Sequence, residues 1–85
     1  MAHTIEFTAA ANREYRKLPR GVQTAIRSAI DALAADPRPH GVEKMAGMDD
    51  TWRIRVGDYR IVYRIFDDRL VVLVIRVGHR REIYR

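Results

Sequence analysis

Apolar and polar side chains alternate between residues 52 and 65, and Gly57 and Asp58 interrupt the alternation near its midpoint. A period of two predicts strands that bury one face, and a Gly-Asp step between two such runs predicts a tight hairpin turn. The turn sets the register, which pairs Val56 with Tyr59, Arg55 with Arg60, Ile54 with Ile61 and Arg53 with Val62. The predicted buried face consists of Trp52, Ile54, Val56, Tyr59, Ile61, Tyr63 and Ile65.

The residues before this hairpin predict a short strand and two helices. Residues 4–7 alternate in the same way, and Thr8 is a suitable N-cap for a first helix that Pro19 ends. The apolar stripe of this helix is Ala11, Tyr15 and Leu18. A second helix extends to Asp36 and Pro37, and its apolar stripe is Val22, Ile26, Ala29, Ile30 and Leu33.

The segment after the hairpin predicts one more strand. Asp67 and Asp68 indicate a turn, and residues 69–77 are apolar on both faces, which predicts a central strand covered on both sides. Residues 78–85 are too few and too polar to assign. We therefore predict a single domain over residues 1–85 with an α+β fold. Its order is strand, helix, helix, strand, strand, strand, and a twisted, mainly antiparallel sheet packs on a helical hairpin.

The size of the chain excludes several classes of protein. Its 85 residues leave no room for a second core, and the absence of cysteine excludes disulfides and thiolate metal sites. The longest apolar run, residues 70–75, is far shorter than the about 20 residues that a membrane span needs. The N-terminal residues lack the apolar segment of a signal peptide, so we expect a cytoplasmic protein without membrane contacts.

Positive charge is concentrated in the second half of the chain. Residues 1–51 are neutral in sum, whereas residues 52–85 carry nine arginines against four acids, which accounts for the whole net charge of +5. The chain has 14 arginines and only two lysines. Arginine grips phosphate with a planar fork and stacks on bases, so the composition predicts a polyanionic partner. A codon preference for arginine in a GC-rich genome is the alternative explanation of the excess.

The second face of the hairpin gathers four arginines. It carries Arg53, Arg55, Arg60 and Arg64, and the next strand is expected to place Val71, Leu73 and Ile75 beside them. Like charges directly across a ladder, such as Arg55 and Arg60, are destabilising by a few tenths of a kcal/mol unless something neutralises them. A conflict of this kind is typical of a functional site, although a solvated charged face is the alternative. Arg80 and Tyr84 would extend the face if the C-terminal segment folds back over it.

The three histidines differ in what they predict. His3 and His40 lie in a terminal segment and a proline-flanked loop, and we interpret both as incidental. His79 follows the last strand and is a secondary candidate for an acid or base. No spacing of His, Cys or carboxylates predicts a metal site, and we expect no cofactor.

A set of short motifs resembles a known family. Residues 52–63 read Trp-Arg-Ile-Arg-Val-Gly-Asp-Tyr-Arg-Ile-Val-Tyr, a turn with two aspartates follows, residues 77–80 read Val-Gly-His-Arg, and Tyr84 lies near the end. The chain resembles the RelE/ParE toxin superfamily over nearly its whole length, and is most similar to the RelE branch. This resemblance implies the toxin of a type II toxin–antitoxin pair. It also implies a metal-independent endoribonuclease, an mRNA interferase, which cuts mRNA in the ribosomal A site by attack of a 2'-hydroxyl on the adjacent phosphate.

The resemblance also implies roles for individual residues. The positions of Arg53, Arg55, Arg60, Arg80 and Tyr84 match the catalytic positions of the family, with His79 as a further candidate. Well-known members carry lysine where this chain has Arg53 and Arg55, and an arginine, with a pKa above about 12, does not readily accept a proton. Tyr84 is then the better candidate for the base. The predicted RNA-binding residues are Arg53, Arg55, Arg64 and Arg81.

The sequence leaves two other functions open. A ParE-like toxin that inhibits DNA gyrase would share the fold, and a non-catalytic RNA-binding or ribosome-binding module would use the same arginines. The resemblance implies a cognate antitoxin, the ribosome and mRNA as partners, with a toxin–antitoxin hetero-oligomer as the assembly.

Overall fold

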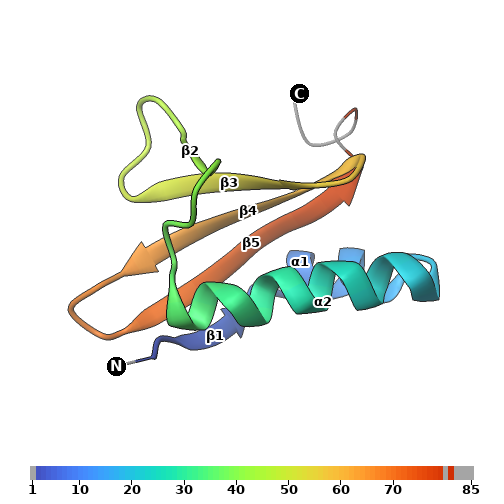
Figure 1. The fold of residues 1–85 in the computed structure, drawn as a ribbon, viewed down its shortest axis with the longest axis horizontal. Helices are drawn as coiled ribbons and strands as arrows, with labels where there is room; N and C mark the ends of the chain where they lie inside the picture. The colour runs from blue at the N-terminus through green and yellow to red at the C-terminus, as the bar shows by residue number, and fades with distance from the viewer. Residues whose placement is uncertain (1, 80, 82–85) are drawn as a thin grey trace.

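The computed structural model describes residues 2–79 and 81, which form two helices and one sheet (Figure 1). In chain order the elements are β1 (Thr4–Phe7), α1 (Ala9–Arg16), α2 (Arg20–Ala35), β2 (Glu43–Lys44), β3 (Thr51–Val56), β4 (Tyr59–Phe66) and β5 (Val71–His79). The strands lie in the order β1-β5-β4-β3-β2. β1 runs parallel to β5 and the other neighbours are antiparallel, which confirms the predicted α+β fold.

Local chemistry explains where the helices begin and end. The Thr8 hydroxyl accepts a hydrogen bond from the Ala11 amide at 3.1 Å, so the predicted N-cap of α1 is confirmed. The first helix ends at Arg16, earlier than expected, and Pro19 serves as the N-cap position of α2. Two hydrogen bonds tie the helices together: the Tyr15 hydroxyl donates to the Gln23 carbonyl, and the Gln23 side chain donates to the Tyr15 carbonyl.

The hairpin register is the one that the sequence predicts. Val56 pairs with Tyr59, and Arg55 pairs with Arg60. Gly57 has φ of +60°, a value that glycine adopts without strain in such a turn. Both helices cover the same face of the sheet (Figure 1), and the core between the two layers consists of Ala11, Ile26, Ile30, Leu33, Ile61, Tyr63, Ile65, Val72, Val74 and Val77.

Two expectations about the last strand are corrected. β5 is central, between β1 and β4, but the helices cover only one of its faces, and Val71 and Leu73 are half-buried on the other. The register between β4 and β5 shifts between Val62 and Tyr63, because a bulge leaves Ile75 without a direct partner and places Arg76 opposite Val62. Val71 and Leu73 lie opposite Phe66 and Arg64 as expected, whereas Ile75 has no direct partner on β4.

The α1 helix completes the edge of β5 where β1 ends. The Glu14 carboxylate accepts a hydrogen bond from the Val77 amide at 2.9 Å and lies 2.9 Å from the Arg76 guanidinium. The Glu14 side chain thus accepts the hydrogen bond that the Val77 amide would have donated to a longer β1. Within the described residues, neither helix is long and apolar enough to cross a membrane.

The segment between α2 and β3 is anchored to the sheet by polar contacts. The buried Tyr63 hydroxyl donates to the Pro37 carbonyl at 2.8 Å. Arg38 lies 2.8 Å from Asp67, in the turn after β4, and 3.8 Å from Asp50. The His3 imidazole is 3.4 Å from the same Asp67 carboxylate. These contacts join four stretches of chain that are distant in sequence.

Candidate functional site

The sheet face opposite the helices, here called the open face, carries the four predicted arginines. Arg53 and Arg55 come from β3, and Arg60 and Arg64 come from β4. Side chains two residues apart on a strand share a face, and the register places these four together while the alternate residues face the core. Gly78 lies opposite Arg60 on β5 and adds no side chain there.

A carboxylate that the sequence analysis did not select lies between two of these arginines. Glu43, on the short strand β2, has one oxygen 3.2 Å from Arg53 and the other 4.0 Å from Arg60. The pairing of Glu43 with Arg53 places this acid on the open face. Its negative charge partly offsets the charge of Arg60, which pairs directly with Arg55 across the ladder.

No local pattern in the sequence marks Glu43 for this position. A strand of two residues is too short for a periodicity, and the turn that returns the chain to β3 has an irregular sequence. The sequence offers only a weak indication of a strand here: two charged residues, Glu43 and Lys44, are followed by Gly47, which can form a turn before the hairpin. Only the pairing of β2 with β3 brings the carboxylate to the arginines.

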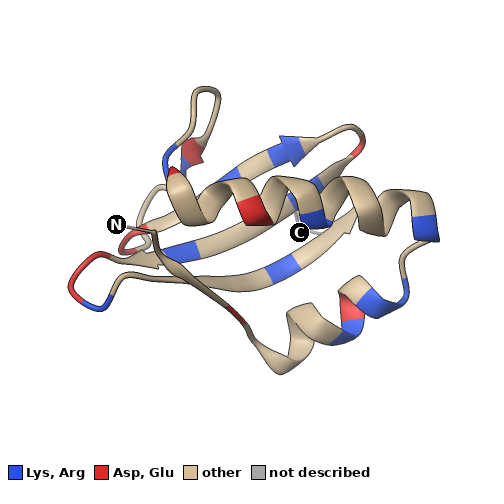
Figure 2. Ribbon diagram, turned by 60° about the horizontal axis from the view of Figure 1, so that its bottom comes forward, with Lys and Arg blue, Asp and Glu red and all other residues tan. Residues whose placement is uncertain are grey.

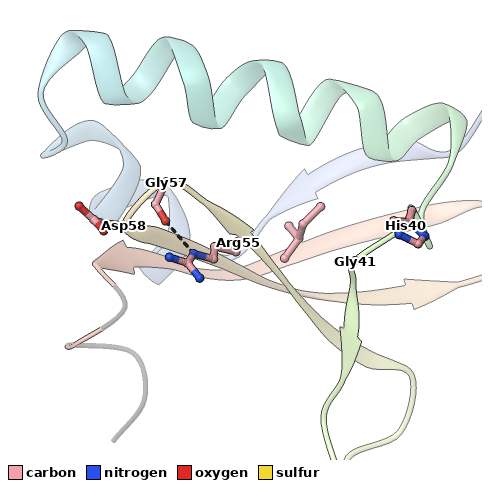
Figure 3. A pocket seen from close by; sticks show the side chains of 6 residues that line it. His40, Gly41, Arg55, Gly57 and Asp58 are labelled. Atoms are coloured by element: carbon pink, nitrogen blue, oxygen red, sulfur yellow. Dashed lines mark hydrogen bonds between the residues drawn. The ribbon is translucent and has the colours of Figure 1, made fainter.

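Arg55 is more exposed than its neighbours and borders a groove. Its Nε atom donates to the Gly57 carbonyl at 3.1 Å, which turns the side chain toward the β3–β4 turn (Figure 3). The groove has a volume of about 570 Å³ and extends along β3 as far as the loop at residues 40–41. Its lining residues are His40, Gly41, Ile54, Arg55, Gly57 and Asp58.

Two other predicted residues, Arg64 and His79, lie on opposite faces of the sheet. Arg64 lies on the open face, with its guanidinium carbon 4.7 Å from the centre of the Phe66 ring. His79 pairs with Tyr59, their ring centres are 5.5 Å apart, and it lines a hollow of about 380 Å³ with Leu18 and other residues on the helix side of the sheet. The structure therefore does not bring His79 together with the arginines of the open face.

Three predicted site residues lie in the C-terminal segment, and the structure describes one of them, Arg81. The exposed Arg81 donates its backbone amide to the His79 Nδ1 atom at 3.2 Å. Arg80 and Tyr84 lie outside the described residues. Among the residues that the structure describes, no three His, Cys, Asp or Glu side chains are placed to hold a metal ion.

A second basic surface lies on α1, on the opposite side of the molecule. Arg13, Arg16 and Lys17 are exposed and line a hollow of about 320 Å³. Figure 2 shows positively charged residues on α1 as well as on strands of the sheet. The acid between them in sequence, Glu14, is held by Arg76 and does not neutralise this surface. The sequence did not indicate this surface, because the charges of residues 1–51 sum to zero.

The open face has the chemistry to bind a phosphodiester. Clustered guanidinium groups bind phosphate oxygens and stabilise the additional charge of a pentacovalent phosphorus. A carboxylate such as Glu43 accepts hydrogen bonds and protons, which an arginine does not do. The arrangement therefore combines charge stabilisation with one proton-accepting group.

Comparisons with known proteins identify the relatives of this chain. Residues 5–84 match the family described as "ParE toxin of type II toxin-antitoxin system, parDE". The chain is 36% identical to Toxin RelG of Mycobacterium tuberculosis over 86 residues, covering 100% of this chain and 99% of that protein. It is 34% identical to the mRNA interferase toxin RelE of Escherichia coli over 88 residues, covering 99% and 92% of the two chains.

Solved structures show the same fold. The toxin in the intact E. coli RelBE toxin-antitoxin complex has a TM-score of 0.83 and 32% identity, covering 92% of this chain and 96% of that one. The isolated E. coli RelE toxin has a TM-score of 0.83 and 33% identity, covering 98% and 92%.

Proposed function

The chain belongs to the RelE/ParE superfamily of toxins from type II toxin–antitoxin systems, and we propose that it is a ribosome-dependent endoribonuclease of the RelE type. The observation that carries the proposal is the arginine cluster of the open face, in which Arg53 and Arg60 share the Glu43 carboxylate. The relatives named as mRNA interferases support RNA as the substrate.

The proposed reaction is an internal transesterification. The 2'-oxygen loses its proton and bonds to the adjacent phosphorus, and the bond from phosphorus to the 5'-oxygen breaks. The leaving oxygen takes up a proton, and the products carry a 2',3'-cyclic phosphate and a 5'-hydroxyl. Arg53, Arg55 and Arg60 bind the phosphate and stabilise its developing charge. The family resemblance assigns Arg80 to the leaving oxygen.

Two groups are proposed as the proton acceptor. The family resemblance favours Tyr84, whereas Glu43 is the carboxylate that contacts Arg53 and Arg60 in the described structure. Single-turnover cleavage on saturating ribosomes, measured across pH, distinguishes them. Loss of the true acceptor, by Tyr84→Phe or Glu43→Gln, lowers the rate by roughly 10²-fold or more, while the other variant stays within a few-fold of the parent protein. A large loss in His79→Ala alone would instead assign the role to His79.

Dependence on the ribosome follows from the chemistry of the face. Arginines supply no strong base, so the 2'-hydroxyl must be oriented in line by other means, and a programmed ribosome provides that orientation. A ribosomal target also implies a cytoplasmic location. We further assign a cognate antitoxin as the physiological partner, because structural relatives are solved as toxin–antitoxin complexes.

The test compares three substrates for the purified protein. We expect cleavage of mRNA within A-site codons on programmed ribosomes, little cleavage of the same RNA without ribosomes, and no change in DNA supercoiling by gyrase. Mapping the 5' ends of the RNA fragments locates the cuts. Efficient cleavage of free RNA would contradict the ribosome dependence, and intact mRNA together with altered supercoiling would favour a ParE-like toxin.

A further inference from the structure

At the end of the open face nearest the β4–β5 turn, two arginines contact one aromatic ring. In the sequence, Phe66 lies between Arg64 and Arg69. The guanidinium carbons of Arg64 and Arg69 lie 4.7 and 4.2 Å from the centre of the Phe66 ring. The Arg69 amide donates to the Phe66 carbonyl at 3.2 Å, which fixes the turn beside the ring. We call these three side chains the ring cluster.

The Phe66 ring holds the two arginines of the ring cluster. Among the described residues neither Arg64 nor Arg69 forms an ion pair, whereas Arg27, Arg38, Arg53 and Arg76 each lie within 4 Å of a carboxylate. Asp67, in the same turn, is already bound by Arg38. An aromatic ring holds a guanidinium in place without neutralising it, so both cations remain available to an anion.

The ring cluster continues the arginine cluster along one strand. Arg60, Arg64 and Phe66 share the open face of β4, and the six residue-to-residue steps from Arg60 to Phe66 span about 20 Å. Leu73 lies opposite Arg64, and Val71 lies opposite Phe66, and both are half-buried. They give this end of the face an apolar floor.

Uncompensated cations, guanidinium planes and an apolar floor are the features that bind unpaired nucleotides. Bases stack on aromatic rings and on arginine planes, and phosphates pair with the same cations. We propose that the ring cluster is a base-stacking subsite for single-stranded RNA, several nucleotides away from the phosphate bound at Arg53 and Arg60. The inference rests on the proposed function, because it takes RNA as the ligand of the open face.

The test is a scan with abasic nucleotides. A single-stranded RNA of eight nucleotides is made with one base removed at each position in turn, and its affinity for the full chain is measured by fluorescence anisotropy at low salt. We expect one position at which base removal weakens binding about tenfold, or about 1.4 kcal/mol. Phe66→Leu, which keeps apolar bulk without the ring, and Arg69→Gln should each abolish that positional effect. Arg20→Gln, which removes an exposed arginine from α2, should preserve it.

The outcomes separate this inference from the proposed function. A flat profile for the parent protein, or a positional effect that persists in Phe66→Leu, would overturn the subsite. Phe66→Leu that weakens antitoxin binding with an unchanged abasic profile would also overturn it, since the cluster would then contact protein. A positional effect that is lost in Phe66→Leu supports the subsite, whatever the arginine variants show. Normal RNA binding by Arg53→Gln and Arg60→Gln would contradict the proposed function but not the subsite.

Discussion

Arg60 keeps only 11% of its side chain exposed although it carries a full charge. A charge in this position is stable when a counter-charge and hydrogen bonds compensate for the lost water, and Glu43 supplies part of that compensation. Arg60 lies between Arg55 on β3 and Gly78 on β5, and of the four open-face arginines it alone is buried, which restricts the motion of its side chain. A held guanidinium stabilises a transition state without first having to be ordered.

Arg60→Lys tests whether the guanidinium fork itself is required. Lysine keeps the charge and the apolar stem but loses the bidentate geometry, so we expect the fold to survive and single-turnover cleavage on ribosomes to fall by roughly 10²-fold. Arg27→Lys, on the exposed surface of α2, is the matched control and should cleave at the parent rate. Cleavage by Arg60→Lys within a few-fold of that rate would show that a point charge is sufficient.

Among the elements, the segment between α2 and β3 depends most on contacts outside itself. It contains only the two residues of β2, yet it must place Glu43 against the arginines. Tyr63 from β4 and Asp67 from the following turn hold its first residues through Pro37 and Arg38. The stability of this segment therefore depends on hydrogen bonds that can be removed one at a time.

Tyr63→Phe removes one such bond and leaves the ring in the core. Burial raises the pKa of Tyr63, so the hydroxyl is neutral and donates to Pro37 at all physiological pH values. We expect the free energy of unfolding to fall by about 1 kcal/mol, since the Pro37 carbonyl loses its partner. Urea denaturation measures the change. Tyr59→Phe, whose hydroxyl has no hydrogen bond to another described residue, should differ from the parent protein by less than about 0.5 kcal/mol.

Asp67→Asn tests the ionic anchor through its pH dependence. The hydrogen bond from Arg38, with a further one from His3, lowers the pKa of Asp67 in the folded protein. A lowered pKa stabilises the fold above the unfolded value, and this contribution disappears as the pH falls through the folded value. We therefore expect Asp67→Asn to melt below the parent protein at pH 7. The difference should begin to shrink as the pH falls below about 4, the value in the unfolded chain, and should vanish below the lowered pKa of the folded protein.

The neighbouring aspartate provides the control for this measurement. Asp68 is exposed and forms no ion pair with another described residue, so Asp68→Asn should melt close to the parent protein at every pH. A melting difference for Asp67→Asn that stays constant down to pH 2 would show that the carboxylate does not act through its charge.

At the scale of the whole molecule, positive charge lies on two opposite surfaces (Figure 2). The open face carries the arginines of β3 and β4, and α1 carries Arg13, Arg16 and Lys17 on the other side of the sheet. A protein that only held a short single strand would need one such surface. Two basic surfaces are suited to a binding site in which RNA contacts the protein from both sides, as we expect in the proposed ribosomal complex.

The triple variant Arg13→Gln, Arg16→Gln, Lys17→Gln tests the surface on α1. Removing phosphate contacts reduces both affinity and its salt dependence, by a slope of roughly 0.7 to 0.9 for each phosphate. We expect weaker binding to programmed ribosomes, with a salt slope lower by about 2, and an unchanged cleavage rate once ribosomes are saturating. Titrations at several salt concentrations provide both numbers. An unchanged slope would mean that α1 faces solvent in the complex.

Local signals were sufficient for most of the fold. The alternation in residues 52–65 and the Gly57-Asp58 turn together determine the hairpin register, because a shift of one residue would expose the whole apolar face. The Thr8 cap and the apolar stripe of α2 depend on neighbours within two helical turns. The common face of Arg53, Arg55, Arg60 and Arg64 follows from parity alone, so these residues were predicted to lie together without knowledge of the tertiary structure.

Contacts between distant segments decided the rest. Glu43 reaches Arg53 and Arg60 only because β2 pairs with β3, and a strand of two residues leaves no periodic trace. The bulge beside Val62 leaves Ile75 without a partner and pairs Val62 with Arg76, an irregularity of the ladder that the apolar run of residues 70–75 does not predict. The parallel pairing of β1 with β5 likewise joins segments that two helices and three strands separate in the chain. A linear pattern records which face a side chain takes within its own element, but the neighbours across that face are set by packing among all the elements at once.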